Sequence, residues 1–272
     1  MISIVCTYND QAILNNYLLK SLRDQTVHFE LATIDNTNNS FRSAAQALNY
    51  GGLRTKGDYI MFAHQDIFFL SNNWLQKAES MLDEQESVGV AGVAGMRYIK
   101  VKMRLKAGRI FAQSAIGTVF HGVTIEPWNG NKKFSGLEEV QTLDELVLIV
   151  PRKVFETLHF DGKTCDGWHL YGVDYSLSVK KMNLKSYVLP LPVWHLSTGS
   201  INEDYYKTLK KVLFKHKKCK SLYTTCGFWH TNYFLNLFEL FIMASKAEIG
   251  KWAGLNDHGA HPYTRPIKAF LA

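Results

Sequence analysis

Two side chains that could hold a divalent cation follow a short apolar run. The segment "YIMFA" at 59–63 is followed directly by His64, Gln65 and Asp66. An imidazole and a carboxylate at the end of one strand can bind a divalent ion. Asp66 could equally cap the turn after the strand. Both interpretations stay open on these residues alone.

A second polar group follows the apolar segment "HFELATI" at 28–34. Asp35 is followed by Asn36, Asn38 and Asn39. Such a run is typical of a simple turn in which side chains accept hydrogen bonds from the backbone. As a binding site, it would offer a carboxylate acceptor to a nucleotide base or a ribose.

An aspartate and a histidine frame the segment at 171–197, "YGVDYSLSVKKMNLKSYVLPLPVWHLS". Asp174 lies in a turn that precedes an amphipathic helix, and His195 ends an apolar strand. A buried histidine on such a strand is by default a core residue bonded to backbone.

Alternating strand and helix patterns predict how the first hundred residues are built. Strands are expected at 2–8, 28–36 and 57–67, and helices at 11–25, 39–53 and 72–88. This alternation favours a mostly parallel sheet with helices on both faces, which binds ligands at the carboxyl ends of its strands. Three polar segments, 8–10, 35–39 and 64–66, fall at such ends.

The pattern changes after residue 96. Apolar and basic residues alternate strictly from Ile99 to Lys106, so we expect an antiparallel excursion over 97–126. Further strands are expected at 144–152 and 185–195, and helices at 152–158, 203–220 and 229–246. We predict a catalytic domain at 1–200, with halves 1–96 and 97–200, and a helical extension at 201–272.

Composition limits the class of protein. The chain has 272 residues, 46% of them apolar, and its four cysteines form no CxxC pair, which favours a reducing compartment. No secretory signal opens the sequence. The apolar run at 233–244 is too short to cross a bilayer, which takes about twenty residues. The net charge of +7 indicates anionic partners.

Six segments in order resemble the glycosyltransferase family 2 proteins of the GT-A nucleotide-sugar fold. They are "ISIVCTYND", "LLKSLRDQT", "HFELATIDNTNNS", "ALNYGGLRTKGDYIMF" with "HQD" at the place of the family's DxD, "ELVLIVPRKVFETLHFD" and "YGVDYSLSVKKMNLKSYVLPLPVWH". The resemblance covers residues 1–197 and is greatest to the bacterial subset associated with capsule and other surface polysaccharides. His64 replaces the first acid of the DxD, and Val173 replaces the usual glutamate.

The resemblance implies a metal-dependent, inverting transfer of a sugar from a nucleoside-diphosphate donor, with UDP as the commonest nucleotide. It assigns Asp174 as catalytic base, and Asp66 and His195 as ligands of Mn²⁺ or Mg²⁺. The donor would contact a set of residues from the first three strands, the turns after them and the helix at 39–53: Thr7, Tyr8, Asn9, Asp35, Asn49, His64 and Asp66. Under this interpretation Asp35, Asp66 and Asp174 line a common crevice.

The acceptor side of such a site would use two acids and two aromatic residues. Asp144 and Glu145 could bind sugar hydroxyls or be solvated acids at a strand start. Trp168 and Tyr171 could form a wall against a pyranose or pack within a loop. The expected acceptor is a glycan or a lipid-linked glycan.

The lysine-rich segment 205–220 and the apolar segment 233–244 favour a cytoplasmic protein that lies on the inner face of a bacterial plasma membrane. Packing on the catalytic domain, or formation of a homodimer, is the alternative for 233–244. We expect no nucleic-acid partner, because exposed aromatics do not interleave with the basic strand. Two other functions stay open: a nucleotide-sugar-binding protein without catalysis and a basic polyanion-binding protein.

Overall fold

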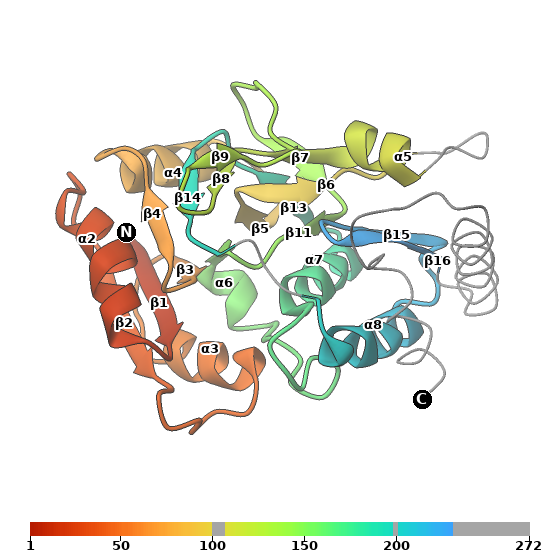
Figure 1. The fold of residues 1–272 in the computed structure, drawn as a ribbon, viewed down its shortest axis with the longest axis horizontal. Helices are drawn as coiled ribbons and strands as arrows, with labels where there is room; N and C mark the ends of the chain where they lie inside the picture. Colours follow the sequence, from red (N-terminus) through yellow and green to blue (C-terminus); the bar gives the residue numbers. More distant parts are fainter. Residues whose placement is uncertain (100–106, 198–200, 231–272) are drawn as a thin grey trace, which may run out of the picture.

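A seven-stranded sheet forms the centre of the protein (Figure 1). The computed structural model describes residues 1–99, 107–197 and 201–230. The strands of the central sheet lie in the order β10 (Glu138–Val140), β13 (Lys185–Val188), β5 (Val88–Gly92), β12 (Val147–Pro151), β3 (Tyr59–Ala63), β1 (Ile2–Tyr8) and β2 (Glu30–Asp35).

This sheet is mixed, which corrects the expectation of a mostly parallel one. The pairs β1–β2, β1–β3 and β13–β5 are parallel, whereas β12 runs antiparallel to both β3 and β5, and β10 runs antiparallel to β13. All five residues of β12 are buried, so its continuous apolar run gives no sign of direction. The antiparallel direction places the start of β12 beside the carboxyl end of β3.

Two smaller sheets and a hairpin complete the β-structure. One sheet has the order β11 (Thr142–Leu143), β6 (Ala94–Met96), β7 (Ala115–Gly117); the other has the order β4 (Ile67–Phe69), β14 (Val193–His195), β8 (Val119–His121), β9 (Glu126–Pro127). The hairpin joins β15 (Ser221–Thr224) to β16 (Gly227–His230). The strand expected at 185–195 is therefore two strands in different sheets.

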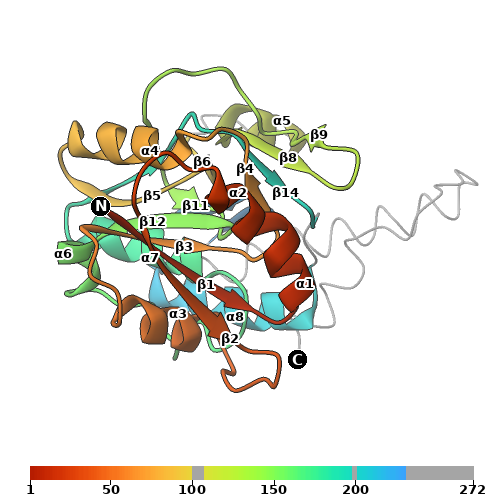
Figure 2. The ribbon, with the colours of Figure 1, turned by 90° about the vertical axis from the view of Figure 1, so that its left-hand side faces the viewer.

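Helices cover both faces of the central sheet, as expected. They are α1 (Gln11–Leu14), a π-helical turn η1 (Asn15–Leu19), α2 (Lys20–Arg23), α3 (Ala44–Gly52), α4 (Trp74–Asp83), α5 (Ala107–Ser114), α6 (Arg152–Phe155), α7 (Tyr171–Lys181) and α8 (Glu203–Lys215). Figure 2 shows α2 and α4 on one side of β1 and β3, with α3 and α8 on the other. Helix α5 lies where β-structure was expected, and the basic strand expected at 99–106 falls almost entirely outside the described residues.

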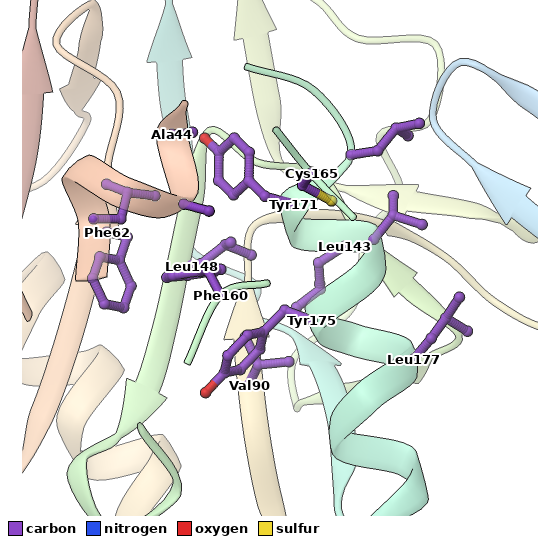
Figure 3. Packing of buried hydrophobic residues seen from close by; sticks show 14 of the residues in the cluster. Ala44, Phe62, Val90, Leu143, Leu148, Phe160, Cys165, Tyr171, Tyr175 and Leu177 are labelled. Atoms are coloured by element: carbon purple, nitrogen blue, oxygen red, sulfur yellow. The ribbon is translucent and has the colours of Figure 1, made fainter. Parts of the chain in front are cut away.

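Alternation along the strands divides the core into two clusters. Ile60 and Phe62 on β3 pack into the cluster beneath α3, α6, α7 and α8, whereas Met61 and Ala63 pack into the cluster beneath α1, η1, α2 and α4. This is the period of two that a strand buried on both faces imposes. Figure 3 shows part of the first cluster, in which Phe160 lies between Phe62 of β3 and Tyr175 of α7.

Helix α8 is part of this larger core. Tyr205, Tyr206, Leu209, Val212 and Leu213 are buried in the same cluster as the central strands. The packing therefore shows no division at residue 200. The apolar segment 233–244, with its expected membrane or dimer contact, lies outside the described residues, and no described helix is long and apolar enough to cross a membrane.

The packing of α3 on β1 predicts that Gly51 tolerates no larger side chain. A Cβ added there would lie 2.4 Å from Cγ1 of the buried Val5, and overpacking of this kind costs about 1–3 kcal/mol. Gly51→Ala should therefore lower the thermal unfolding midpoint. Gly136→Ala is the control, because an added Cβ meets nothing within 4 Å there. Equal midpoints in both variants would contradict this packing.

Candidate functional site

A cavity of about 320 Å³ opens at the carboxyl ends of β1 and β3. It is lined by Thr7, Tyr8, Asn9, Asn36, Asn39, Ala44, Leu48, Phe62, Ala63, His64, Gln65, Asp66, Trp168 and Tyr171. Because parallel strands bring their carboxyl ends to one edge, the polar segments after β1, β2 and β3 meet here as expected. Ala44, Phe62 and Tyr171, which Figure 3 labels, contribute to its wall.

Gln65 shapes the loop after β1, a role that the sequence did not indicate. Its Oε1 accepts hydrogen bonds from the backbone N–H groups of Asn9 and Asp10, at 3.0 and 3.1 Å, and its Nε2 donates to Oδ1 of Asn9 at 2.6 Å. The middle residue of the His-Gln-Asp triplet thus joins the first and third strand ends. It fixes the backbone that lines the cavity beside Tyr8.

His64, Asp66 and His195 form a group with the ligand chemistry of a metal site. One ligand atom from each lies within 4.8 Å of the others. Oδ1 of Asp66 lies 3.3 Å from Nε2 of His195 and 4.0 Å from Nδ1 of His64. His195 reaches Asp66 because β14 pairs antiparallel with β4, which places His195 opposite Ile67. Asp66 and His195, expected as metal ligands, thus lie next to each other, and their role as ligands stays a prediction.

The pKa shifts within this group favour the protonation states that bind a cation. Burial of Asp66 opposes ionisation, but the hydrogen bond and charge of His195 outweigh it and lower the pKa of Asp66 to about 2. Burial and the neighbouring His195 lower the pKa of His64. At neutral pH the group therefore combines a carboxylate with an uncharged His64 imidazole, the form that binds metals.

Tyr171 fixes the orientation of His64. Its hydroxyl lies 3.1 Å from Nε2 of His64, which leaves Nδ1 to face Asp66. A histidine that binds a metal through one ring nitrogen commonly bonds a protein group through the other. Nδ1 of the buried His195, by contrast, has no hydrogen-bond partner among the described residues.

His121 is a third histidine in this region and was missed from the sequence. It lies beside His195 in the parallel pair β8–β14, and the two ring centroids are 5.5 Å apart. Its Nδ1 lies 3.2 Å from the carbonyl oxygen of Ser197. The signal was weak, because "VFH" at 119–121 has no pattern beyond that of a short strand.

Of two residues expected to bind the donor, Asp35 lies next to the main cavity and Asn49 does not. Asp35 ends β2 beside Tyr8, where its Oδ1 accepts hydrogen bonds from the N–H and the hydroxyl of Thr37, which lower its pKa. It therefore lies next to the cavity as an exposed carboxylate. Asn49 does not line the cavity: its amide group clamps the backbone of Phe160 through two hydrogen bonds of 2.9 and 3.0 Å.

Asp174 does not reach the cavity, which corrects the expectation of a common crevice with Asp35 and Asp66. The residue is 2% exposed, on the first turn of α7. Its Oδ2 accepts a hydrogen bond from Nζ of Lys215 at 2.7 Å, and its Oδ1 lies 2.7 Å from Nε2 of His216. Lys215 also pairs with Asp161 at 2.9 Å. Nothing near Asp174 in the sequence indicated these partners from α8 and the residue after it.

Trp168 separates the main cavity from a second one. The second cavity, also about 320 Å³, is lined by Arg42, Asp166, Gly167, Trp168, His169, Asn202, Asp204, Lys207, Thr208 and Lys211. Trp168 is 43% exposed and belongs to both walls. Trp168 and Tyr171 therefore face the same cavity as His64, whereas Asp144 and Glu145 line neither cavity.

Comparison with protein families gives a match over most of the chain. The profile of the family described as "Glycosyltransferase like family" matches residues 3–217. This range contains every candidate site residue discussed above. The comparison with curated protein sequences gives no match.

Solved structures share the fold at low sequence identity. The mannosyltransferase PcManGT from Pyrobaculum calidifontis, in complex with GDP-Man and Mn²⁺, is 12% identical over 99% of this chain and 84% of its own, with a TM-score of 0.58. GalNAc-T7 with UDP, GalNAc and Mn²⁺ is 11% identical over 78% of this chain and 47% of its own, with a TM-score of 0.55. These similarities show an α/β fold of the GT-A type.

The ion pairs of Asp174 predict a large loss of stability when its carboxylate is removed. Asp174→Ala leaves the buried His216 without its partner, and loss of one member of a buried pair costs about 3–5 kcal/mol. The loss of stability should lie near the lower end of this range, because Lys215 retains its ion pair with Asp161. Chemical denaturation measures the free energy of unfolding.

Glu139→Ala is the matched control for this measurement. Glu139 pairs with Lys185 at 2.9 Å, but both side chains are about half exposed. Exposed pairs contribute about 0–1 kcal/mol. A loss no larger in Asp174→Ala than in the control would contradict a structural role for Asp174.

Proposed function

The chain belongs to the glycosyltransferase-like family, and on this premise we propose that it transfers a sugar from a nucleoside-diphosphate donor bound with a divalent metal in the main cavity. The observation that carries this proposal is the cluster of His64, Asp66 and His195 at the wall of that cavity. Leaving-group diphosphates are strongly anionic, and a cavity of this size with a cation site at one side accommodates such a donor.

The chemistry of the three metal-binding side chains favours Mn²⁺ over Mg²⁺. His64, Asp66 and His195 would hold the ion through two imidazoles and one carboxylate. Mg²⁺ prefers oxygen ligands and an octahedral shell, whereas imidazole suits transition metals. When bound, the ion supplies positive charge that stabilises the departing diphosphate. Both solved structures described above were obtained with Mn²⁺, which agrees with this choice.

The remaining lining residues divide between the two ends of a donor. The backbone at the end of β1, at 7–9, and the Asp35 carboxylate lie at the end of the cavity formed by β1 and β2, and they suit the nucleoside. Trp168 and Tyr171 lie with His64 and suit the sugar, because aromatic faces pack well against the C–H groups of a pyranose. We assign no donor contact to Asn49, whose amide is occupied.

The finer parts of the proposal rest on the sequence resemblance. UDP is the proposed nucleotide, inversion the proposed stereochemistry, and a glycan or lipid-linked glycan of bacterial surface polysaccharide the proposed acceptor. A location on the inner face of the plasma membrane is supported by the exposed lysines of α8, such as Lys207 and Lys211. A thermal-shift panel of UDP-, dTDP- and GDP-sugars, with and without Mn²⁺, identifies the donor, because a bound ligand raises stability.

Removal of the central carboxylate should abolish metal-linked donor binding. In Asp66→Asn the cluster loses its only anionic ligand, so the Mn²⁺-dependent part of the thermal shift with UDP should vanish and donor turnover should fall by about 10² or more. Glu84→Gln, at the end of α4 and remote from the cavity, should leave both unchanged. A full Mn²⁺-dependent shift in Asp66→Asn would place the metal elsewhere.

The hydroxyl of Tyr171 should tune metal affinity without contacting the ion. Tyr171→Phe removes the partner of Nε2 of His64, and loss of such a partner weakens metal binding by about 10–100-fold. Tyr175→Phe, one turn further along α7, removes a hydroxyl that bonds the carbonyl oxygen of Leu158. Isothermal titration with Mn²⁺ compares the two, and equal affinities would show that His64 needs no support from Tyr171.

A further inference from the structure

Sugar transfer to a hydroxyl requires a group that takes the proton of that hydroxyl, and Asp174 is not placed to do so. Asp174 is 2% exposed and is enclosed by its partners Lys215 and His216, so an acceptor hydroxyl cannot approach it. A general base must lie within hydrogen-bond reach of the proton that it removes. The carboxylate that serves this reaction therefore has to come from another element at the rim of the main cavity.

The antiparallel pairing of β12 with β3 brings a carboxylate to that rim. Val147 pairs with Ala63, and the N–H of His64 donates to the carbonyl oxygen of Leu146 at 3.0 Å. The residues that leave β3 toward the metal cluster thus run beside the residues that enter β12. Asp144 lies in this entering segment, on the same rim as His64 and Asp66.

The Asp144 side chain is held in a fixed orientation and keeps acceptor capacity. Its Oδ2 accepts a hydrogen bond of 2.6 Å from the hydroxyl of Thr225, and its Oδ1 accepts one of 3.3 Å from the N–H of Leu146. Each carboxylate oxygen has a second lone pair. The residue is half-buried, so solvent and ligands can approach it.

The charge of Asp144 acts on residues of the main cavity. Burial lowers the pKa of His64, and the Asp144 carboxylate acts against that shift. Burial raises the pKa of Tyr171, and the carboxyl groups of Glu145 and Asp144 raise it further. His64 and Tyr171 both line the cavity, so Asp144 lies near two residues of the cavity wall, although it does not line the cavity itself.

Glu145, the neighbouring acid, is a poorer candidate. Burial and the Asp144 charge raise the pKa of Glu145 well above its usual range. Its side chain lies against Gly172 at the start of α7, since a Cβ added to that glycine would be 3.0 Å from Cγ of Glu145. Of the two adjacent acids, Asp144 is therefore the better placed candidate, because the Glu145 side chain is directed at α7.

We propose that Asp144 is the catalytic base, an inference that rests on the proposed function. The acceptor oxygen forms a bond to the anomeric carbon while the bond from that carbon to the diphosphate oxygen breaks. The bonding electron pair leaves with the diphosphate, and the proton of the acceptor hydroxyl moves to the Asp144 carboxylate. No further reactant is needed to balance this step.

The test compares donor hydrolysis, in which water replaces the acceptor, in the full chain and its variants. The probes are UDP-glucose, UDP-N-acetylglucosamine and GDP-mannose with Mn²⁺. Asp144→Asn should lower kcat by about 10² or more, while the thermal shift with UDP and Mn²⁺ stays that of the wild type. Formate should restore part of the activity of Asp144→Ala, which a purely structural defect would not allow. Asp24→Asn, the same change at an exposed carboxylate, is the control.

Each outcome separates this inference from the proposed function. A wild-type chain that neither binds nor hydrolyses any probe refutes the proposed function and the inference with it. A wild type that turns over while Asp144→Asn keeps kcat within about threefold refutes the inference alone. Loss of activity in Glu145→Gln with Asp144→Asn still active would assign the base to Glu145 and overturn the proposal in the same way.

Discussion

The buried carboxylate of Asp174 imposes a constraint on which much of the cavity wall depends. An unpaired charge at that position would be costly, so Lys215 and His216 must remain beside it. Lys215 also binds Asp161, which begins the segment leading to Trp168 and Tyr171. The ion pairs therefore hold α7, α8 and this segment in one arrangement. The metal-binding residues themselves lie on other strands, but Tyr171 orients His64 from α7.

The direction of β12 is the second determinant of the site. A purely parallel sheet would bring only strand carboxyl ends, and the loops after them, to the rim of the cavity. Because β12 runs antiparallel to β3, the segment before β12 arrives at the same rim. Residues from the two halves of the chain thus meet around His64. The small sheet of β4, β14 and β8 adds His195 and His121 from a third direction.

The sequence was sufficient to predict strands and site residues where the local residue pattern and the side-chain chemistry agree. Strand ends at Tyr8 and Asp35 follow from apolar runs interrupted by polar residues, whereas the third strand ends at Ala63, before the expected end near Asp66. Asp66 and His195 follow from a family resemblance. The direction of β12 could not be predicted, since a strand buried on both faces shows the same pattern either way. The burial and ion pairing of Asp174 depend on α8, about forty residues further along the chain, and no local sequence pattern predicts such a pairing.

The indole of Trp168 forms part of two walls, one for each cavity. Molecules seated on its two sides would not bind independently, because any reorientation of the ring that enlarges one cavity reduces the other. The resulting coupling is reciprocal: whatever factor the first occupant applies to the affinity of the second, the second applies to the first. A single exposed side chain can thus couple the occupancy of two neighbouring cavities.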